Sequence, residues 1–188
     1  MVYDIAIVGG GPAGASAALF AAKAGKKTLL VDADKGMTRR AMVHNHYGIP
    51  DITGPDLVDT GHRQAIRFGA ELLKALVTDV RRTPAGFELV SEQGTFEARQ
   101  VILATGAAID LAQKMGLPAK TATEPRIRAV LGVDSSGRTE IPGLWAAGTV
   151  AGTSVHTIVT AGDGARVAIN VISELNGARW VDHEVLRT

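Results

Sequence analysis

Residues 2–22 read VYDIAIVGGGPAGASAALFAA, an apolar run that passes through three glycines into an alanine-rich run. The first part, 3–8, predicts a buried parallel strand, and residues 12–24 predict a helix that ends at Gly25. A second apolar segment, 27–31, predicts another strand, and Asp32 follows it directly. Strand, glycine turn, helix, strand and acid in this order predict a binding site for an adenine dinucleotide.

The glycine turn has the spacing Gly9-x-Gly11-x-x-Gly14. A pyrophosphate needs many donors, and the first turn of a helix offers free backbone N–H groups and a positive dipole end. Gly9 allows a sharp turn, Gly11 lets the ligand approach the backbone, and Gly14 lets the helix pack on the strand. Asp32 is placed to accept hydrogen bonds from the adenosine ribose, and its charge disfavours the 2′-phosphate of NADP. The expected contact residues in this part are Gly9, Gly11, Pro12, Ala13, Gly14, Asp32 and Ala33.

Composition narrows the classes of protein to consider. The 188 residues are 46% hydrophobic and 21% charged with a net charge of +1, which indicates a globular chain and no nucleic-acid surface. No apolar run reaches the roughly 20 residues of a membrane helix, and the N-terminus enters a strand at once, so we expect a cytoplasmic protein. Cysteine is absent, which excludes disulfides, thiol catalysis and thiolate metal sites on this chain.

The remaining patterns predict one α/β domain over residues 1–188, with a parallel sheet flanked by helices and a β-meander inserted at about 80–99. A loop is expected over 33–53, long enough to have a function. Helices are expected over 54–69, 109–115 and 155–175, and strands over 71–80, 87–91, 95–98, 100–106 and 141–148.

Several motifs together resemble the thioredoxin reductase branch of FAD-dependent oxidoreductases. They are VGGGPAGASAA at 8–18, Asn45 with TGPDL at 53–57, VILATGA at 101–107, IPGLWAAGT at 141–149 and TAGDGA at 160–165, in that family's order. The chain is most similar to the small, single-domain proteins related to thioredoxin reductase. The resemblance implies a Rossmann-like FAD-binding domain, with FAD and not NAD as the dinucleotide.

The resemblance also implies further contacts with FAD. Adenine is expected by the strand around Val77, and the start of the last helix is expected at the pyrimidine edge of the flavin. Members of the branch usually carry aspartate where this chain has Thr149, so a charge is missing there. The residues added in this way are Asn45, Val77, Ala104, Thr105, Gly106, Gly148, Thr149, His156 and Thr157.

A full thioredoxin reductase also has an NADPH domain with its own glycine fingerprint and a Cys-x-x-Cys pair. Here that domain is missing between about 107 and 141, and no second fingerprint or cysteine is present. The sequence therefore predicts an oxidoreductase that cannot relay electrons through a dithiol. The alternative is a flavin-binding module or subunit that turns over only with a partner. An NAD-dependent dehydrogenase is a third reading, and it predicts a colourless protein.

Histidines are the remaining candidates for chemistry. His156 could donate a proton to a substrate or to reduced flavin, or could contribute only its backbone amide. His44 and His46 lack a third ligand, so no metal site is expected. The electron donor and acceptor are not identified by the sequence, and a homodimer is expected only by analogy with small members of the branch.

Overall fold

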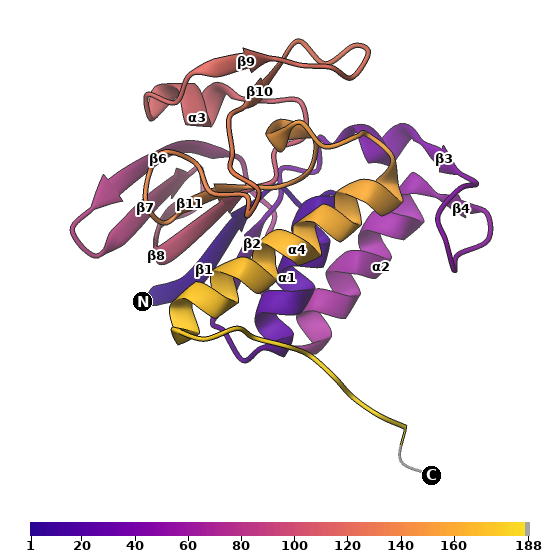
Figure 1. Ribbon diagram of the computed structural model, residues 1–188, viewed down its shortest axis with the longest axis horizontal. Coiled ribbons are helices and arrows are strands. Elements are labelled where there is room, and N and C mark those ends of the chain that lie inside the picture. The colour runs from indigo at the N-terminus through magenta and orange to yellow at the C-terminus, as the bar shows by residue number, and fades with distance from the viewer. Residues whose placement is uncertain (187–188) are drawn as a thin grey trace.

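The computed structural model describes residues 1–186. Its centre is a seven-stranded sheet in the order β5-β2-β1-β8-β7-β6, with β11 also paired to β8 (Figure 1). Five of these strands run parallel and end at the same edge of the sheet. They are β5 (Glu71–Leu73), β2 (Thr28–Val31), β1 (Val2–Val8), β8 (Gly94–Leu103) and β11 (Leu144–Ala146).

Strand β8 belongs to two parts of the sheet. Its first half pairs antiparallel with β7 (Gly86–Ser91), which pairs in turn with β6 (Val77–Thr83) to form the meander. Its second half pairs with β11, and β1 follows it along both halves. The prediction of two separate strands, 95–98 and 100–106, was therefore wrong, because β1 supplies a continuous parallel partner.

The strand expected over 71–80 was also wrong, since the chain breaks it at residues 74–76. Strand β5 lies beside β2 at one end of the sheet, and β6 lies beside β7 at the other. The crossing is fixed by two backbone hydrogen bonds, from Asp32 N to Leu73 O (2.9 Å) and from Ala75 N to Asp32 O (3.1 Å). The chain thus bends around the end of β2 before it enters the meander.

Helices α1 (Pro12–Lys23), α2 (Gly54–Arg67) and α4 (Thr157–Asn176) cover one face of the sheet (Figure 1). Small residues let α1 sit close to both neighbours. A Cβ on Gly164 of α4 would overlap the backbone of Ala13, and a Cβ on Gly61 of α2 would lie 2.9 Å from the Ala15 methyl group. The fully buried side chains Ile5 and Ile7 of β1 pack against this helical layer.

The other face carries the meander, the short helix α3 (Asp110–Lys114) and a hairpin of β9 (Ala119–Thr121) with β10 (Ala129–Leu131). The two layers around a mostly parallel sheet confirm the predicted Rossmann-like α/β class. The expected 33–53 loop instead contains short elements, namely the 3-10 helix η1 (Met37–Arg40) and the strands β3 (Met42–Val43) and β4 (Ile52–Thr53). Within residues 1–186, no helix has the length and apolarity needed to cross a bilayer.

Candidate functional site at the carboxyl edge of the sheet

The loops that follow the parallel strands meet at one edge. Backbone hydrogen bonds join them in sequence across the sheet, from Gly9 N to Val31 O (2.8 Å), from Ala104 N to Val8 O (2.8 Å) and from Ala147 N to Leu103 O (2.9 Å). The chain goes from β1 to β2 on one side and later to β8 on the other. The crevice between β1 and β8 is therefore the switch point at which open α/β sheets bind ligands.

The glycines of the first turn are required for different reasons. Gly9 has a φ of +103°, and a Cβ there would overlap the Ala104 carbonyl oxygen. A Cβ on Gly14 would overlap the Gly9 carbonyl oxygen, so this glycine allows the helix to pack on the turn. Gly11 differs, because its φ is −66° and a Cβ there would meet no atom within 4 Å. Neither strain nor packing within the chain explains Gly11.

The amino end of α1 is open toward this crevice. Gly11 is its N-cap and provides no side chain to cap the helix, and its first turn has no acidic residue. The first internal hydrogen bond goes from Ala15 N to Gly11 O (2.8 Å), so the amides before it lack helical partners. In contrast, α2 begins with Thr53, which accepts from Asp56 N (3.2 Å), and Asp56 adds a negative charge. The start of α1 is thus suited to an anion.

The amino end of α4 is open in the same way. His156 is its N-cap without a side-chain hydrogen bond to the helix, and the first turn again has no acid. The Thr157 hydroxyl is buried and is the only such side-chain group within residues 1–186 that has no hydrogen-bond partner. An unpaired buried hydroxyl costs about 1–3 kcal/mol. A bound ligand with a polar edge would remove this cost.

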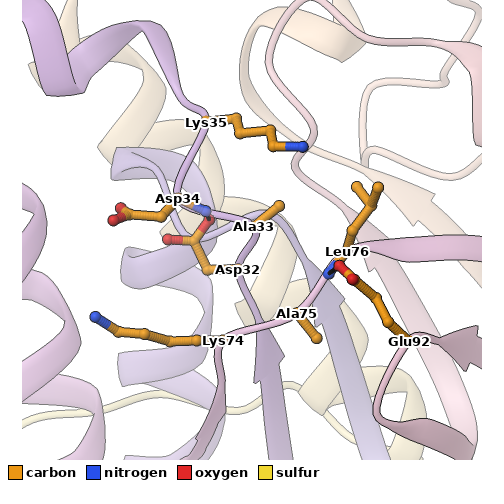
Figure 2. Close-up of a pocket in the computed structure, with 8 residues that line it drawn as sticks. All are labelled: Asp32, Ala33, Asp34, Lys35, Lys74, Ala75, Leu76 and Glu92. Carbon is orange, nitrogen blue, oxygen red and sulfur yellow. Dashed lines mark hydrogen bonds between the residues drawn. The ribbon is translucent and has the colours of Figure 1, made fainter.

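Asp32 lies at the end of β2 and is 8% exposed. Its Oδ1 accepts hydrogen bonds from Gly10 N (3.1 Å) and Asp34 N (3.2 Å), which fixes the carboxylate and leaves Oδ2 available to a ligand. Figure 2 shows this carboxylate between the chain segments that carry Lys35 and Lys74. It borders a cavity of about 130 Å³ that is lined by Asp32, Ala33, Asp34, Lys35, Lys74, Ala75, Leu76 and Glu92.

The turn after β11 is held by an acid from α4. Asp163 Oδ2 accepts from Gly148 N (2.7 Å) and from Thr153 Oγ1 (2.9 Å), while its Oδ1 accepts from Arg166 Nη2 (2.7 Å). The buried Thr149, in the 3-10 helix η2 (Gly148–Ala151), has no carboxylate, but Asp163 brings one to the adjacent amide. The sequence Gly-Asp-Gly within α4 thus lets Asp163 hold this turn and Gly164 approach α1.

Most of the predicted contact residues lie at this edge, but two do not fit as simply. Asn45 is exposed in the loop between β3 and β4, which Figure 1 shows beyond α2 and away from the sheet. Val77 is buried at the start of β6, and the neighbouring Leu76 lines the cavity instead. Ala104, Thr105 and Gly106 directly follow β8, opposite the glycine turn.

Two of the histidines that the sequence singled out, His156 and His44, lie on the surface. His156 is exposed, and its Nδ1 lies 2.8 Å from Ser154 Oγ, so its Nε2 is left for other partners. His44 Nδ1 lies 2.6 Å from Asp51 Oδ1 in the exposed β3–β4 loop. Neither histidine belongs to a group of three metal-ligating side chains in the described part of the chain.

One buried residue was missed by the sequence analysis. His62 of α2 is 5% exposed, and its Nε2 lies 2.8 Å from the carbonyl oxygen of Gly10. A signal was present, because His62 stands four residues after Val58 and three before Ala65, on the buried face of the helix. The cavity residues Lys35, Lys74 and Glu92 were also missed, since they are surface charges without a motif.

The sequence is also similar to known proteins. Residues 3–131 match the family described as "Pyridine nucleotide-disulphide oxidoreductase". A thioredoxin reductase of Peptoclostridium litorale is 42% identical over 115 residues, which is 59% of this chain and 36% of that protein. The chain therefore spans just over a third of the length of this relative.

Solved structures share the fold. A thioredoxin reductase from Gloeobacter violaceus aligns over 99% of both chains with a TM-score of 0.78 at 20% identity. An oxidoreductase from Agrobacterium tumefaciens aligns over 94% of this chain and 99% of its own, with a TM-score of 0.81 at 17% identity. At these identities the similarity concerns the fold alone.

Proposed function

Because the chain belongs to the pyridine nucleotide-disulphide oxidoreductase family, we propose that it is an FAD-dependent oxidoreductase that transfers electrons without a dithiol of its own. It is a thioredoxin reductase-like domain of that family, whose members bind FAD. The chain spans only 36% of the thioredoxin reductase described above.

Gly11 is the observation that carries the proposal. Its backbone conformation suits any residue, and a Cβ there would point into open space next to the uncapped amides of α1. A glycine at this position is explained by a ligand that must come close to the backbone. The pyrophosphate of FAD has the negative charge that this helix end favours. Asp32 Oδ2 lies at the end of the neighbouring strand, where it can accept from the adenosine ribose.

We place the flavin at the amino end of α4. Its free amides and the unpaired Thr157 hydroxyl can donate to the carbonyl groups of the flavin's pyrimidine edge. The positive end of this helix would stabilise negative charge on that edge. When bound, FAD would supply the exchange of an electron pair, and the exposed His156 could supply a proton at Nε2.

The route of the electrons follows from what the 188 residues contain. They include no cysteine, so no disulfide on this chain can accept electrons from the flavin. We therefore propose that an external acceptor takes them from the flavin directly. Because the chain spans only about a third of the thioredoxin reductase described above, a second function is also possible to test. In it, the chain is a flavin-binding subunit whose partner brings the reductant.

Gly11→Val tests the cofactor site. The variant should fold with only a small loss of thermal stability, because a Cβ at this position meets no atom within 4 Å and the main cost is a less favourable N-cap, but it should lose bound FAD. Flavin absorbance per protein and thermal melting measure the two quantities. Gly36→Val is the matched control, since Gly36 also has open space and an ordinary φ of −65°. Full flavin content in Gly11→Val would show that the pyrophosphate does not lie at this turn.

Anaerobic mixing of the FAD-loaded chain with NADH or NADPH separates the two functions. Bleaching of the flavin absorbance within the mixing time supports an oxidoreductase that accepts a hydride directly. Persistent colour with both donors supports the subunit that depends on a partner. A chain that holds no flavin would contradict both.

A further inference from the structure

The buried imidazole of His62 is not used by the proposed function as described so far. It stands on α2, which provides none of the expected contacts with FAD, yet it reaches the centre of the glycine turn. His62 Nε2 lies 2.8 Å from Gly10 O, and a carbonyl oxygen can only accept. Nε2 therefore carries a hydrogen and donates a hydrogen bond to Gly10 O.

The same nitrogen also faces Asp32. The distance from His62 Nε2 to Asp32 Oδ2 is 3.6 Å, and the two side chains are 5% and 11% exposed. This oxygen is the one that the backbone amides of Gly10 and Asp34 leave free. The edge of the imidazole therefore limits the directions in which Asp32 Oδ2 can point. Both side chains are nearly closed off from solvent.

Gly10 shows how closely these groups pack. It is not one of the three glycines of the fingerprint spacing, so the dinucleotide motif alone does not require it. A Cβ on Gly10 would nevertheless lie 2.6 Å from His62 Nε2 and 2.6 Å from Asp32 Cγ. Position 10 therefore has no room for a side chain, because His62 and Asp32 both pack against the turn there.

From this arrangement we propose that His62 is a positioning residue for the adenosine half of the dinucleotide. Its Nε2–H holds the Gly10 peptide, so that the amides that follow face the pyrophosphate. Its ring keeps Asp32 Oδ2 directed at the ribose hydroxyls. This inference rests on the proposed function, since it concerns how the same cofactor site is held in place.

The test compares two substitutions of His62. Glutamine places an amide Nε2–H near the position of the imidazole Nε2–H, whereas leucine removes the donor and keeps the bulk. ADP is the probe, because it carries the ribose and the pyrophosphate without the flavin. Calorimetry should show ADP binding to His62→Leu weakened by roughly three- to tenfold, the scale of one hydrogen bond, and binding to His62→Gln restored to within about twofold of wild type.

A second ligand makes the test specific to Asp32. The wild type should prefer ADP to 2′,3′-dideoxy-ADP, and this preference should shrink in His62→Leu but not in His62→Gln. Gln64→Leu is the control, because Gln64 is exposed on the same helix. A general loss of stability would weaken both ligands equally and would leave the preference unchanged.

The outcomes separate this inference from the proposed function. A wild-type chain that binds neither FAD nor ADP would overturn both. A wild type that binds them, with His62→Leu equal to it or with His62→Gln as weak as His62→Leu, would overturn the positioning role alone. Should His62→Leu not fold, nitrogen NMR of the wild-type imidazole decides, since a ring protonated only at Nδ1 contradicts the proposal.

Discussion

At the scale of single residues, four neighbouring glycines have four different physical origins. Gly9 allows a positive φ, Gly10 makes room for His62 and Asp32, Gly14 lets α1 touch the turn, and only Gly11 is left to a ligand. The sequence spacing predicts the roles of Gly9, Gly11 and Gly14. It could not predict the need at Gly10, because His62 is 52 residues away in the chain.

Tyr3 gives a prediction about pH at the same scale. Burial, the hydrogen bond from its hydroxyl to Glu71 Oε2 (2.7 Å) and the charge of that carboxylate raise the pKa of Tyr3 from 10.0 to about 12. A raised pKa means that the neutral phenol stabilises the fold below pH 10, and that this contribution is lost as the pH rises toward 12. The free energy of unfolding should therefore decline across that window.

The comparison with Tyr3→Phe isolates this effect. At neutral pH the wild type should be more stable than Tyr3→Phe by about 1 kcal/mol, the usual contribution of a hydrogen bond. Urea unfolding near pH 12 should show this difference reduced or absent, because the tyrosinate would face Glu71 with like charge. A stability difference that stays constant from neutral pH to about 12 would contradict the raised pKa of Tyr3.

At the scale of elements, the uncapped starts of α1 and α4 are the central feature. Both helices begin at the carboxyl edge of the sheet without a capping side chain or an acid, while α2 has Thr53 and Asp56 at its start. Close packing at Ala13 and Gly164 sets the amino end of α1 against the first half of α4. The site is thus built from backbone dipoles more than from charged side chains.

Two glycines of α4 give a matched pair of substitutions. Gly164→Ala should destabilise the fold by about 1–3 kcal/mol, because the new Cβ would overlap the Ala13 backbone and force α1 and α4 apart. Gly162→Ala should stabilise it by up to about 1 kcal/mol, since Gly162 is exposed and has open space in the helix. Free energies of unfolding in urea measure both changes, and equal effects of the two alanines would contradict the close packing of α1 on α4.

The elements also show what the sequence could and could not predict. The strand–turn–helix unit at 2–23 depends on local pattern and was confirmed almost to the residue. The strand expected at 71–80 gave no sign of its break, because the break comes from backbone hydrogen bonds with Asp32, far earlier in the chain. In the same way, Asp163 could be seen in the sequence, but its bond to Gly148 depends on the packing of α4 over the last strand.

At the scale of the whole molecule, the five parallel strands end on one side, and the fingerprint turn, Asp32, the loop after β8 and the start of α4 gather there. This common edge is what makes one extended dinucleotide compatible with residues spread from Gly9 to Thr157. A homodimer and a cytoplasmic location stay predictions.

The measurement that tests the account most directly is calorimetric titration of the ligand-free chain with FAD and, separately, with riboflavin. The central claim is that the amides at the start of α1 bind the pyrophosphate, which FAD has and riboflavin lacks. The account predicts strong binding of FAD and binding of riboflavin weaker by at least about a hundredfold, or nearly 3 kcal/mol. Equal affinity for the two compounds, or no heat with FAD, would contradict it.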